Sequence, residues 1–153
     1  MKQRIYIDTS VVGGYFDEEF KEATQGLFRQ LENGEIIFVV SDLLELELID
    51  APQNVRELLL KYSADKFEKV KFTEEAVTLA DTYIAEKIVE KTSLEDCRHI
   101  ALATINRVDV LASWNFKHIV NLNKIKGYNS VNLRLGYQIL EIRSPKDLVK
   151  YGD

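Results

Sequence analysis

Cysteine is almost absent from this chain of 153 residues, which contains a single one, Cys97. One thiol permits no internal disulfide and no cysteine-based zinc site. The sequence therefore excludes the class of small secreted proteins that disulfides hold together, and we expect the protein in a reducing cytoplasm. Cys97 has no evident base as partner in the sequence, so we interpret it as a small core residue and not as a nucleophile.

Long apolar runs are also missing. No stretch of about 18 consecutive apolar residues occurs, so the sequence predicts no transmembrane helix. The first residues lead directly into a strand-like run and lack the apolar core of a signal peptide. With 46% apolar and 29% charged residues, the composition is that of a globular protein, and we expect one domain over residues 1–153.

The formal net charge of −5 argues against a protein that coats nucleic acid with its whole surface. Acidic residues are nevertheless absent from one stretch, Val110–Leu140. This stretch holds four cationic side chains and five asparagines: Lys117, Lys124, Lys126, Arg134, Asn115, Asn121, Asn123, Asn129 and Asn132. Such side chains bind phosphate, so we expect Lys117, His118 and Lys124 to contact a polyanionic substrate. For any single lysine, a solvated surface position is the simpler interpretation.

Strand-like and helix-like segments alternate along the chain. Strands are expected at 5–7, 36–40 and 108–112, with weaker strands at 67–72 and 139–142. Helices are expected at 20–32, from Asp42 to about Ala51, and at 55–62, 74–90, 93–107 and 116–126, with Gly127 ending the last one. This alternation predicts an α/β fold with a parallel sheet that helices cover on both faces.

Asp8 directly follows the first strand, Ile5–Ile7. Open α/β sheets place their chemistry at the carboxyl ends of strands, so this carboxylate is a candidate catalytic residue. The alternative is that Asp8 only caps the helix that follows it.

Glu47 shares a helical face with apolar residues, among them Leu43, Leu44 and Ala51. A carboxylate on such a face is costly unless it is paired or binds a cation. The alternative is that Glu47 lies at the edge of the face and reaches water.

Asp96 is the third candidate. Ser93 and Asp96 match a capping box, which is the ordinary interpretation of this spacing. Asp96 also shares a face with Ile100 and Ala103, however, and this face should pack on the sheet and direct the carboxylate toward the sheet's carboxyl edge.

Only two histidines occur, His99 and His118, and they offer too few ligands for zinc. We expect His99 to be packed or hydrogen-bonded. Oxygen ligands without cysteine or clustered histidine favour a hard cation, Mg²⁺ or Mn²⁺. Carboxylates around such an ion are typical of phosphoryl chemistry.

Four segments together resemble the PIN-domain family. Ile7–Ser10 (Ile-Asp-Thr-Ser) is similar to the family's first motif, and Ser41–Pro52 to its second, with Glu47 at the acidic position. Asp96–Thr104 (Asp-Cys-Arg-His-Ile-Ala-Leu-Ala-Thr) is close to the most specific motif, and Ala112–His118 looks like the fourth. Their order and spacing fit across nearly the whole chain.

This resemblance implies a three-layer α/β/α fold with a central parallel sheet and the first strand in its middle. It also implies a Mg²⁺- or Mn²⁺-dependent ribonuclease of the VapC toxin type, usually dimeric and neutralised by a VapB-type antitoxin. Carried over by position, Asp8, Glu47 and Asp96 would be metal ligands, and Ser10 would support the site by hydrogen bonding.

Asn115 departs from the family pattern, which typically has Asp at this position. We expect Asn115 to position the attacking water or a substrate phosphate, and a second metal site to be weakened most. The alternative is a weakly active or non-catalytic PIN-fold module that binds a protein or RNA. A phosphatase built around Asp8 ranks last, because Ser10 stands where a second Asp would be required.

Overall fold

Five parallel strands form one sheet in the order β3-β2-β1-β4-β5. The structure is a computed structural model, and it describes residues 1–149. The strands are β1 (Gln3–Ile7), β2 (Ile36–Ser41), β3 (Phe67–Val70), β4 (Val110–Ala112) and β5 (Ile142–Arg143). The first strand is the central one, as the resemblance to the PIN-domain family implied, and β3, predicted as a weaker strand, lies at an edge of the sheet.

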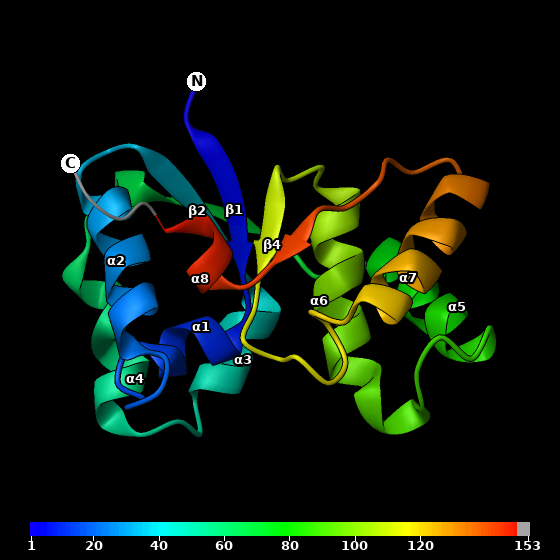
Figure 1. Ribbon diagram of the computed structural model, residues 1–153, viewed down its shortest axis with the longest axis horizontal. Helices are drawn as coiled ribbons and strands as arrows, with labels where there is room; N and C mark the ends of the chain where they lie inside the picture. Colours follow the sequence, from blue (N-terminus) through cyan, green and yellow to red (C-terminus); the bar gives the residue numbers. More distant parts are fainter. Residues whose placement is uncertain (150–153) are drawn as a thin grey trace.

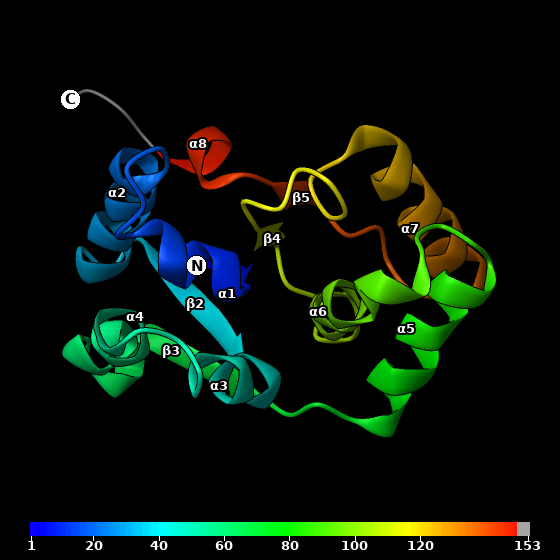
Figure 2. The same cartoon turned by 90° about the horizontal axis from the view of Figure 1, so that it is seen from below.

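Helices cover both faces of the sheet, which confirms the expected three-layer α/β/α arrangement (Figure 1). The helices are α1 (Thr9–Gly14), α2 (Lys21–Glu32), α3 (Asp42–Leu48), α4 (Gln53–Leu58), α5 (Glu74–Ala85), α6 (Leu94–Ile105), α7 (Leu122–Arg134) and α8 (Pro145–Leu148). α1, α2, α4 and α8 lie on one side, and α5, α6 and α7 on the other (Figures 1 and 2). Within residues 1–149, no helix is both long enough and apolar enough to cross a bilayer.

The apolar residues of the strands alternate between the two helical layers because successive side chains of a strand point to opposite faces. In β1, Ile5 and Ile7 pack toward α2, whereas Tyr6 packs toward α6. β2 repeats the pattern with Phe38 and Val39. The strands are therefore buried on both faces, which explains their continuous apolar sequence.

The prediction of a helix over 116–126 is correct only from Leu122 onward. Residues 116–120 form turns, and α7 begins only at Leu122, where the side chain of Asn121 caps it by accepting a hydrogen bond from Lys124 N at 3.2 Å. Gly127 lies inside α7 and does not end it. A Cβ atom at Gly127 would lie 2.9 Å from Ile88, so the glycine permits close packing of α7.

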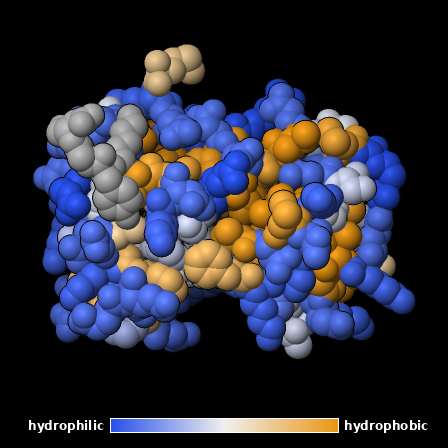
Figure 3. Space-filling model, viewed as in Figure 1, coloured by the Kyte–Doolittle hydropathy of each residue, from blue (hydrophilic) through white to orange (hydrophobic). Residues whose placement is uncertain are grey.

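Other boundaries differ by a few residues. The segment 55–62 is divided between α4 and a 3₁₀ turn, Leu59–Lys61, and β5 begins three residues later than expected. α5 ends at Ala85 because the chain reverses at Lys87, which has a φ of 62°. Leu133 in the last turn of α7, and Leu135 and Ile139 after it, are exposed apolar residues. Figure 3 shows apolar surface in the region of β5 and α7.

Two adjacent glycines in α1 predict opposite effects on stability. A Cβ at Gly14 would lie 2.7 Å from Nε1 of Trp114, whereas a Cβ at Gly13 would meet nothing within 4 Å. Gly14→Ala should destabilise the protein by about 1–3 kcal/mol through overpacking. Gly13→Ala should stabilise it by about 0.5–1 kcal/mol, because alanine favours a helix. Urea unfolding followed by Trp114 fluorescence measures both, and equal midpoints would contradict the prediction.

Candidate active site

The candidate residues gather at the carboxyl edge of the sheet, which Figure 2 views from below. Asp8 directly follows β1, and Ser113 directly follows the neighbouring strand β4. From β1 the chain first adds β2 and β3 on one side, and then crosses to β4 and β5 on the other. Such a switch in strand order leaves a crevice between the two central strands, where α/β proteins bind their ligands.

A cavity of about 260 Å³ at this edge brings the candidates together. Its lining consists of Asp8, Thr9, Ser10, Glu47, Asp96, His99 and Asn115. The four residues predicted to be catalytic, and the predicted supporting Ser10, therefore face one space although they come from α1, α3, α6, and the ends of β1 and β4. A larger, mainly apolar cavity of about 480 Å³ between α3, α4 and β3 contains none of them.

Asp8 is buried, with 4% of its surface exposed, and is held on both oxygens. Ser10 donates to Oδ1 at 2.6 Å, and Ser113 donates to Oδ2 at 2.6 Å. Val11 N also donates to Oδ1 at 3.3 Å, so Asp8 caps α1 as well as facing the cavity. Burial raises the pKa of Asp8, while the charge of His99 and the hydrogen bonds oppose this rise.

Glu47 is the end of a hydrogen-bonded chain that reaches into the core. Its Oε1 lies 2.7 Å from Nε2 of His99, and Thr9 donates to the same oxygen. On the other side of the ring, Nδ1 of His99 lies 2.6 Å from the hydroxyl of Tyr6, which lies 2.9 Å from Oγ of Ser41.

The direction is fixed at the Glu47 end of this chain. Burial raises the pKa of Tyr6 well above its ordinary value, so its hydroxyl is protonated, and it lies within hydrogen-bond distance of both Nδ1 of His99 and Oγ of Ser41. A carboxylate only accepts, so Nε2 of His99 carries a proton and donates it to Glu47. Burial acts to raise the pKa of Glu47, but the hydrogen bond and charge of His99 outweigh it and lower this pKa. Glu47 is thus ionised and paired with His99, which answers the alternative that it only reaches water at the edge of its helical face.

Asp96 lies in the first turn of α6 and is partly exposed. Burial raises its pKa and the negative charge of Asp8 raises it further, whereas His118, His99 and a hydrogen bond from Asn115 oppose the rise. Within the described residues 1–149, Ser93 makes no side-chain capping hydrogen bond, and its buried hydroxyl has no partner. The capping-box interpretation of this segment is therefore wrong, and the side chain of Asp96 belongs to the cavity.

Both the oxygen and the NH₂ group of the Asn115 side chain make hydrogen bonds. Its Oδ1 accepts hydrogen bonds from Lys117 N at 3.1 Å and His118 N at 2.9 Å, which fixes the turn after β4. Its hydrogen bond with Asp96 lowers the pKa of that carboxyl, so the amide NH₂ is the donor. Asn115 thus supports Asp96 as a hydrogen-bond donor, whereas the role predicted for it was to position the attacking water or a substrate phosphate.

The three predicted phosphate-binding residues lie together, Lys117 and His118 on the segment between β4 and α7 and Lys124 in the first turn of α7. Nζ of Lys124 donates to the carbonyl of Lys117 at 3.1 Å and lies 3.3 Å from Nδ1 of His118. The rest of the acid-free stretch is not one basic surface. Arg134, at the far end of α7, pairs with Glu86.

Most of the asparagines in this stretch have structural partners. Asn129 holds the backbone of Leu140 by two hydrogen bonds, at 2.8 and 3.1 Å, and Asn132 is buried against the hydroxyl of Tyr83. Asn121 caps α7. The expectation that these asparagines bind phosphate is therefore wrong, because their amides satisfy buried backbone and side-chain groups.

The donors around the cavity suit a hard cation in kind, because they are carboxylate, hydroxyl and amide oxygens. Among residues 1–149, however, no three His, Cys, Asp or Glu side chains lie close enough together to hold a metal ion in this arrangement. Both oxygens of Asp8 and one of Glu47 already accept hydrogen bonds. Binding of an ion therefore requires Glu47 and Asp96, which are both partly exposed, to move toward Asp8.

Several residues at the site were missed in the sequence. Ser113 follows β4 just as Asp8 follows β1, so its position at the end of a buried strand was an available signal. His99 lies three residues after Asp96 on the same helical face, and hydrogen bonding was the expectation for it. Tyr6 reads as an ordinary core residue, because nothing in its apolar strand reveals a partner for its hydroxyl. Cys97 is buried, and burial raises the pKa of its thiol to about 12, as expected for a core residue.

The sequence matches no protein-family model and no curated protein. Solved structures nevertheless share its fold. One is a chain of FitAcB from Neisseria gonorrhoeae, with 15% identity, a TM-score of 0.57, and coverage of 92% of this chain and 97% of that one.

Two further structures are chains of toxin systems. VapC20 of Mycobacterium tuberculosis, a toxin that cleaves the sarcin-ricin loop, has 11% identity and a TM-score of 0.56, over 74% of this chain and 91% of its own. VapBC2 from Rickettsia felis, bound to DNA from its promoter, has 11% identity and a TM-score of 0.55, over 93% of this chain and 98% of that one. At such low identity, these comparisons establish a shared fold.

Proposed function

We propose that this chain, which has the fold of the VapC-type PIN toxins, is a Mg²⁺- or Mn²⁺-dependent endoribonuclease and the toxin of a toxin–antitoxin pair. One observation carries the proposal. Three carboxylates from separate elements, Asp8, Glu47 and Asp96, line one cavity at the switch point of the sheet. Three basic side chains lie beside it, two on the loop after β4 and one in the first turn of α7. The repulsion between Asp8 and Asp96 that raises the pKa of Asp96 is what a bound cation would relieve.

In this proposal, Asp8, Glu47 and Asp96 hold the ion. When bound, the ion supplies stabilisation of the negative charge that develops on the phosphate and activates water for in-line attack. Ser10 and Ser113 fix both oxygens of Asp8.

The surrounding residues orient these carboxylates and the substrate. His99 orients Glu47 through its Nε2 proton, and Asn115 orients Asp96. Lys117, His118 and Lys124 contact the RNA backbone next to the scissile bond.

The partners follow the same proposal. The neighbours in fold include a toxin–antitoxin complex from Klebsiella pneumoniae, at 17% identity with a TM-score of 0.53, and VapBC2. We therefore propose a VapB-type antitoxin as the protein partner of this chain, and a homodimer as its assembly.

Metal removal tests the proposal directly. Calorimetric titration with Mn²⁺ should show binding, and cleavage of single-stranded and ribosomal RNA should occur with Mn²⁺ and stop when EDTA is added. RNA that is cut equally in EDTA would contradict metal dependence.

A protein that neither binds Mn²⁺ nor cuts RNA would favour the second candidate function, a non-catalytic binding module. The observation that supports this candidate is that, within residues 1–149, the side chains do not converge into a metal site.

A further inference from the structure

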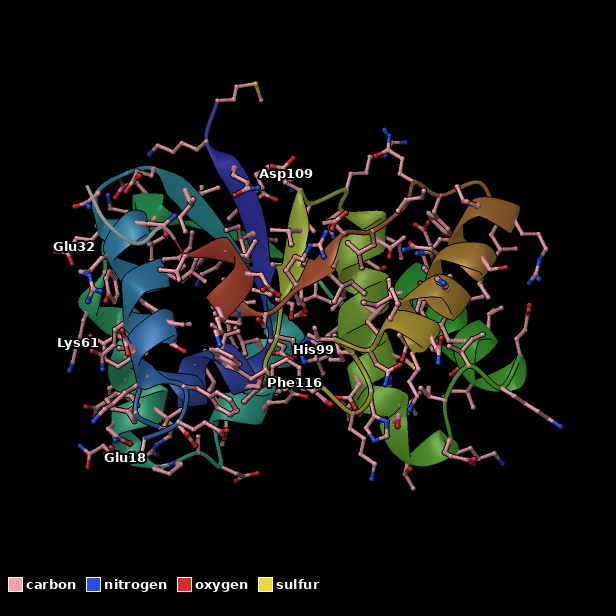
Figure 4. All side chains as sticks on the ribbon, in the orientation of Figure 1. Glu18, Glu32, Lys61, His99, Asp109 and Phe116 are labelled. Carbon is pink, nitrogen blue, oxygen red and sulfur yellow. The ribbon has the colours of Figure 1, made fainter. Side chains whose placement is uncertain are left out.

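Phe116 is a large apolar residue that is half exposed, at 50%, directly beside the cavity. It follows Asn115, which lines the cavity, and precedes Lys117 and His118. Figure 4 shows Phe116 and His99 at the same end of the sheet, the end where β1 and β4 finish. Half of this aromatic side chain, at the rim of the candidate active site, is therefore not covered by the other described residues, 1–149.

Two other aromatic residues pack against the ring of Phe116. Trp114 meets Phe116 edge-on, with ring centroids 6.0 Å apart and an interplanar angle of 65°. Phe20 lies 6.4 Å from Phe116 and stacks on Trp114 at 4.2 Å and 18°. These three residues, Phe20, Trp114 and Phe116, are called the aromatic platform below.

The aromatic platform is tied to the site by hydrogen bonds. Trp114 N donates at 2.8 Å to Oγ of Ser10, which itself donates to Asp8. On its other side, Nε1 of Trp114 donates to Thr24 at 2.9 Å. Because Asn115 fixes the turn that carries Phe116, the exposed ring has a defined position relative to Asp8 and costs little entropy when it binds a ligand.

The charges around the ring favour a nucleic-acid ligand over a protein. Phe116 lies in the acid-free stretch, and Lys117, His118 and Lys124 are its basic neighbours. Proteins that bind single strands combine basic groups for the backbone with aromatic rings on which bases stack. The run Asp17–Glu19 before Phe20 is acidic, so a strand should run from the ring toward the lysines and not toward α2.

We propose that Phe116 is a stacking site for one unpaired base of RNA, next to the phosphate that enters the cavity. This inference rests on the proposed ribonuclease function and adds a substrate feature to it. It requires that the substrate be single-stranded at that nucleotide, since the face of a paired base is covered by its neighbours in the helix.

The test compares two labelled strands of eight ribonucleotides, one of mixed sequence and one with an abasic ribose at every position. Binding is measured by fluorescence anisotropy in EDTA, so that neither strand is cut. The wild type should prefer the strand with bases. Phe116→Ala should weaken binding of that strand by about 5- to 100-fold and leave the abasic strand unaffected.

Matched variants separate stacking from general apolar contact. Leu135→Ala removes a side chain of similar exposure, 49%, beyond the far end of α7, and should change neither affinity by more than about twofold. Phe116→Trp should keep the affinity for the strand with bases, because it keeps an aromatic face. Near-UV circular dichroism checks that each variant is folded.

The other outcomes overturn the inference in distinguishable ways. If Phe116→Ala binds the strand with bases as tightly as the wild type does, the stacking site is wrong although the ribonuclease proposal stands. If the wild type binds neither strand, the stacking site and the proposed function fail together. If Phe116→Ala leaves RNA affinity unchanged but alters the oligomeric state, the ring serves a protein contact.

Discussion

Asp96→Asn is expected to lower RNA cleavage by at least about 100-fold and to abolish Mn²⁺ binding, while the protein keeps its fold. The substitution removes one negative charge from the cavity and keeps the size of the side chain. Asp96 is partly exposed, and Asn115 can still donate to the remaining oxygen. Loss of activity should therefore come with little change in unfolding free energy.

Glu95→Gln is the matched control, because it removes a charge from the adjacent residue of the same helix. Glu95 is exposed and pairs with Arg98 at 3.0 Å on the surface, so this change should alter cleavage by no more than about twofold. Cleavage rates with Mn²⁺ and calorimetric titrations should be measured for both variants. Undiminished cleavage by Asp96→Asn would remove Asp96 from the proposed metal ligands.

Asp8→Asn is expected to abolish cleavage and, without metal, to make the protein more stable at neutral pH by about 1–2 kcal/mol. The reason is that Asp8 is buried, and burial raises the pKa of its carboxyl above the ordinary value of 3.8. Asparagine has the same shape, can accept from Ser10, and can donate to Ser113 when that hydroxyl rotates.

The effect of Asp8→Asn on the free energy of unfolding should depend on pH in a definite direction. A carboxyl whose pKa is raised by folding binds more protons in the folded than in the unfolded protein, so its contribution to stability falls as pH rises from 3.8 through the raised pKa. The stabilising effect of Asp8→Asn should therefore be largest at about pH 7.5 and shrink toward about pH 4.

Urea unfolding of the wild type and Asp8→Asn across this range, in EDTA, measures the difference. Added Mn²⁺ should stabilise the wild type but not the variant, because only a protein that binds the ion in its folded state gains stability from it. A gain in stability that is equal at both ends of the pH range would show that the buried charge is not its cause.

The architecture could be predicted because it depends on patterns within short segments. The run Ile36–Val40 has the continuous apolar character of a strand buried on both faces, and it forms β2. Asp8 could be placed in the same way, since the end of a buried strand is visible in the sequence. The bounds of α7 could not be predicted in this way, because they depend on capping by Asn121 and on the packing of Gly127 against Ile88.

The hydrogen-bond partners of Glu47 and Asp96 could not be predicted either, because they lie far away in the sequence. Glu47 could be recognised as unusual, but its pairing with His99 joins residues 52 positions apart. Only the fold, which brings α3 and α6 to the same edge of the sheet, reveals it. Asn115 is similar. Its identity suggested a lost ligand, whereas its position shows an amide that holds Asp96 and a turn at once.

The hydrogen bond from Ser113 to Asp8 joins positions 105 residues apart, and it has a consequence for the newly made protein. A nascent chain that has left the ribosome only as far as α5 contains Asp8 and Glu47, but lacks Asp96 on α6 and the strand β4 that lies beside β1. Because the central pairing of the sheet uses a late strand, the crevice closes only after most of the chain has been synthesised. For the proposed ribonuclease, this order of synthesis means that the site cannot form until residues beyond β4 have left the ribosome.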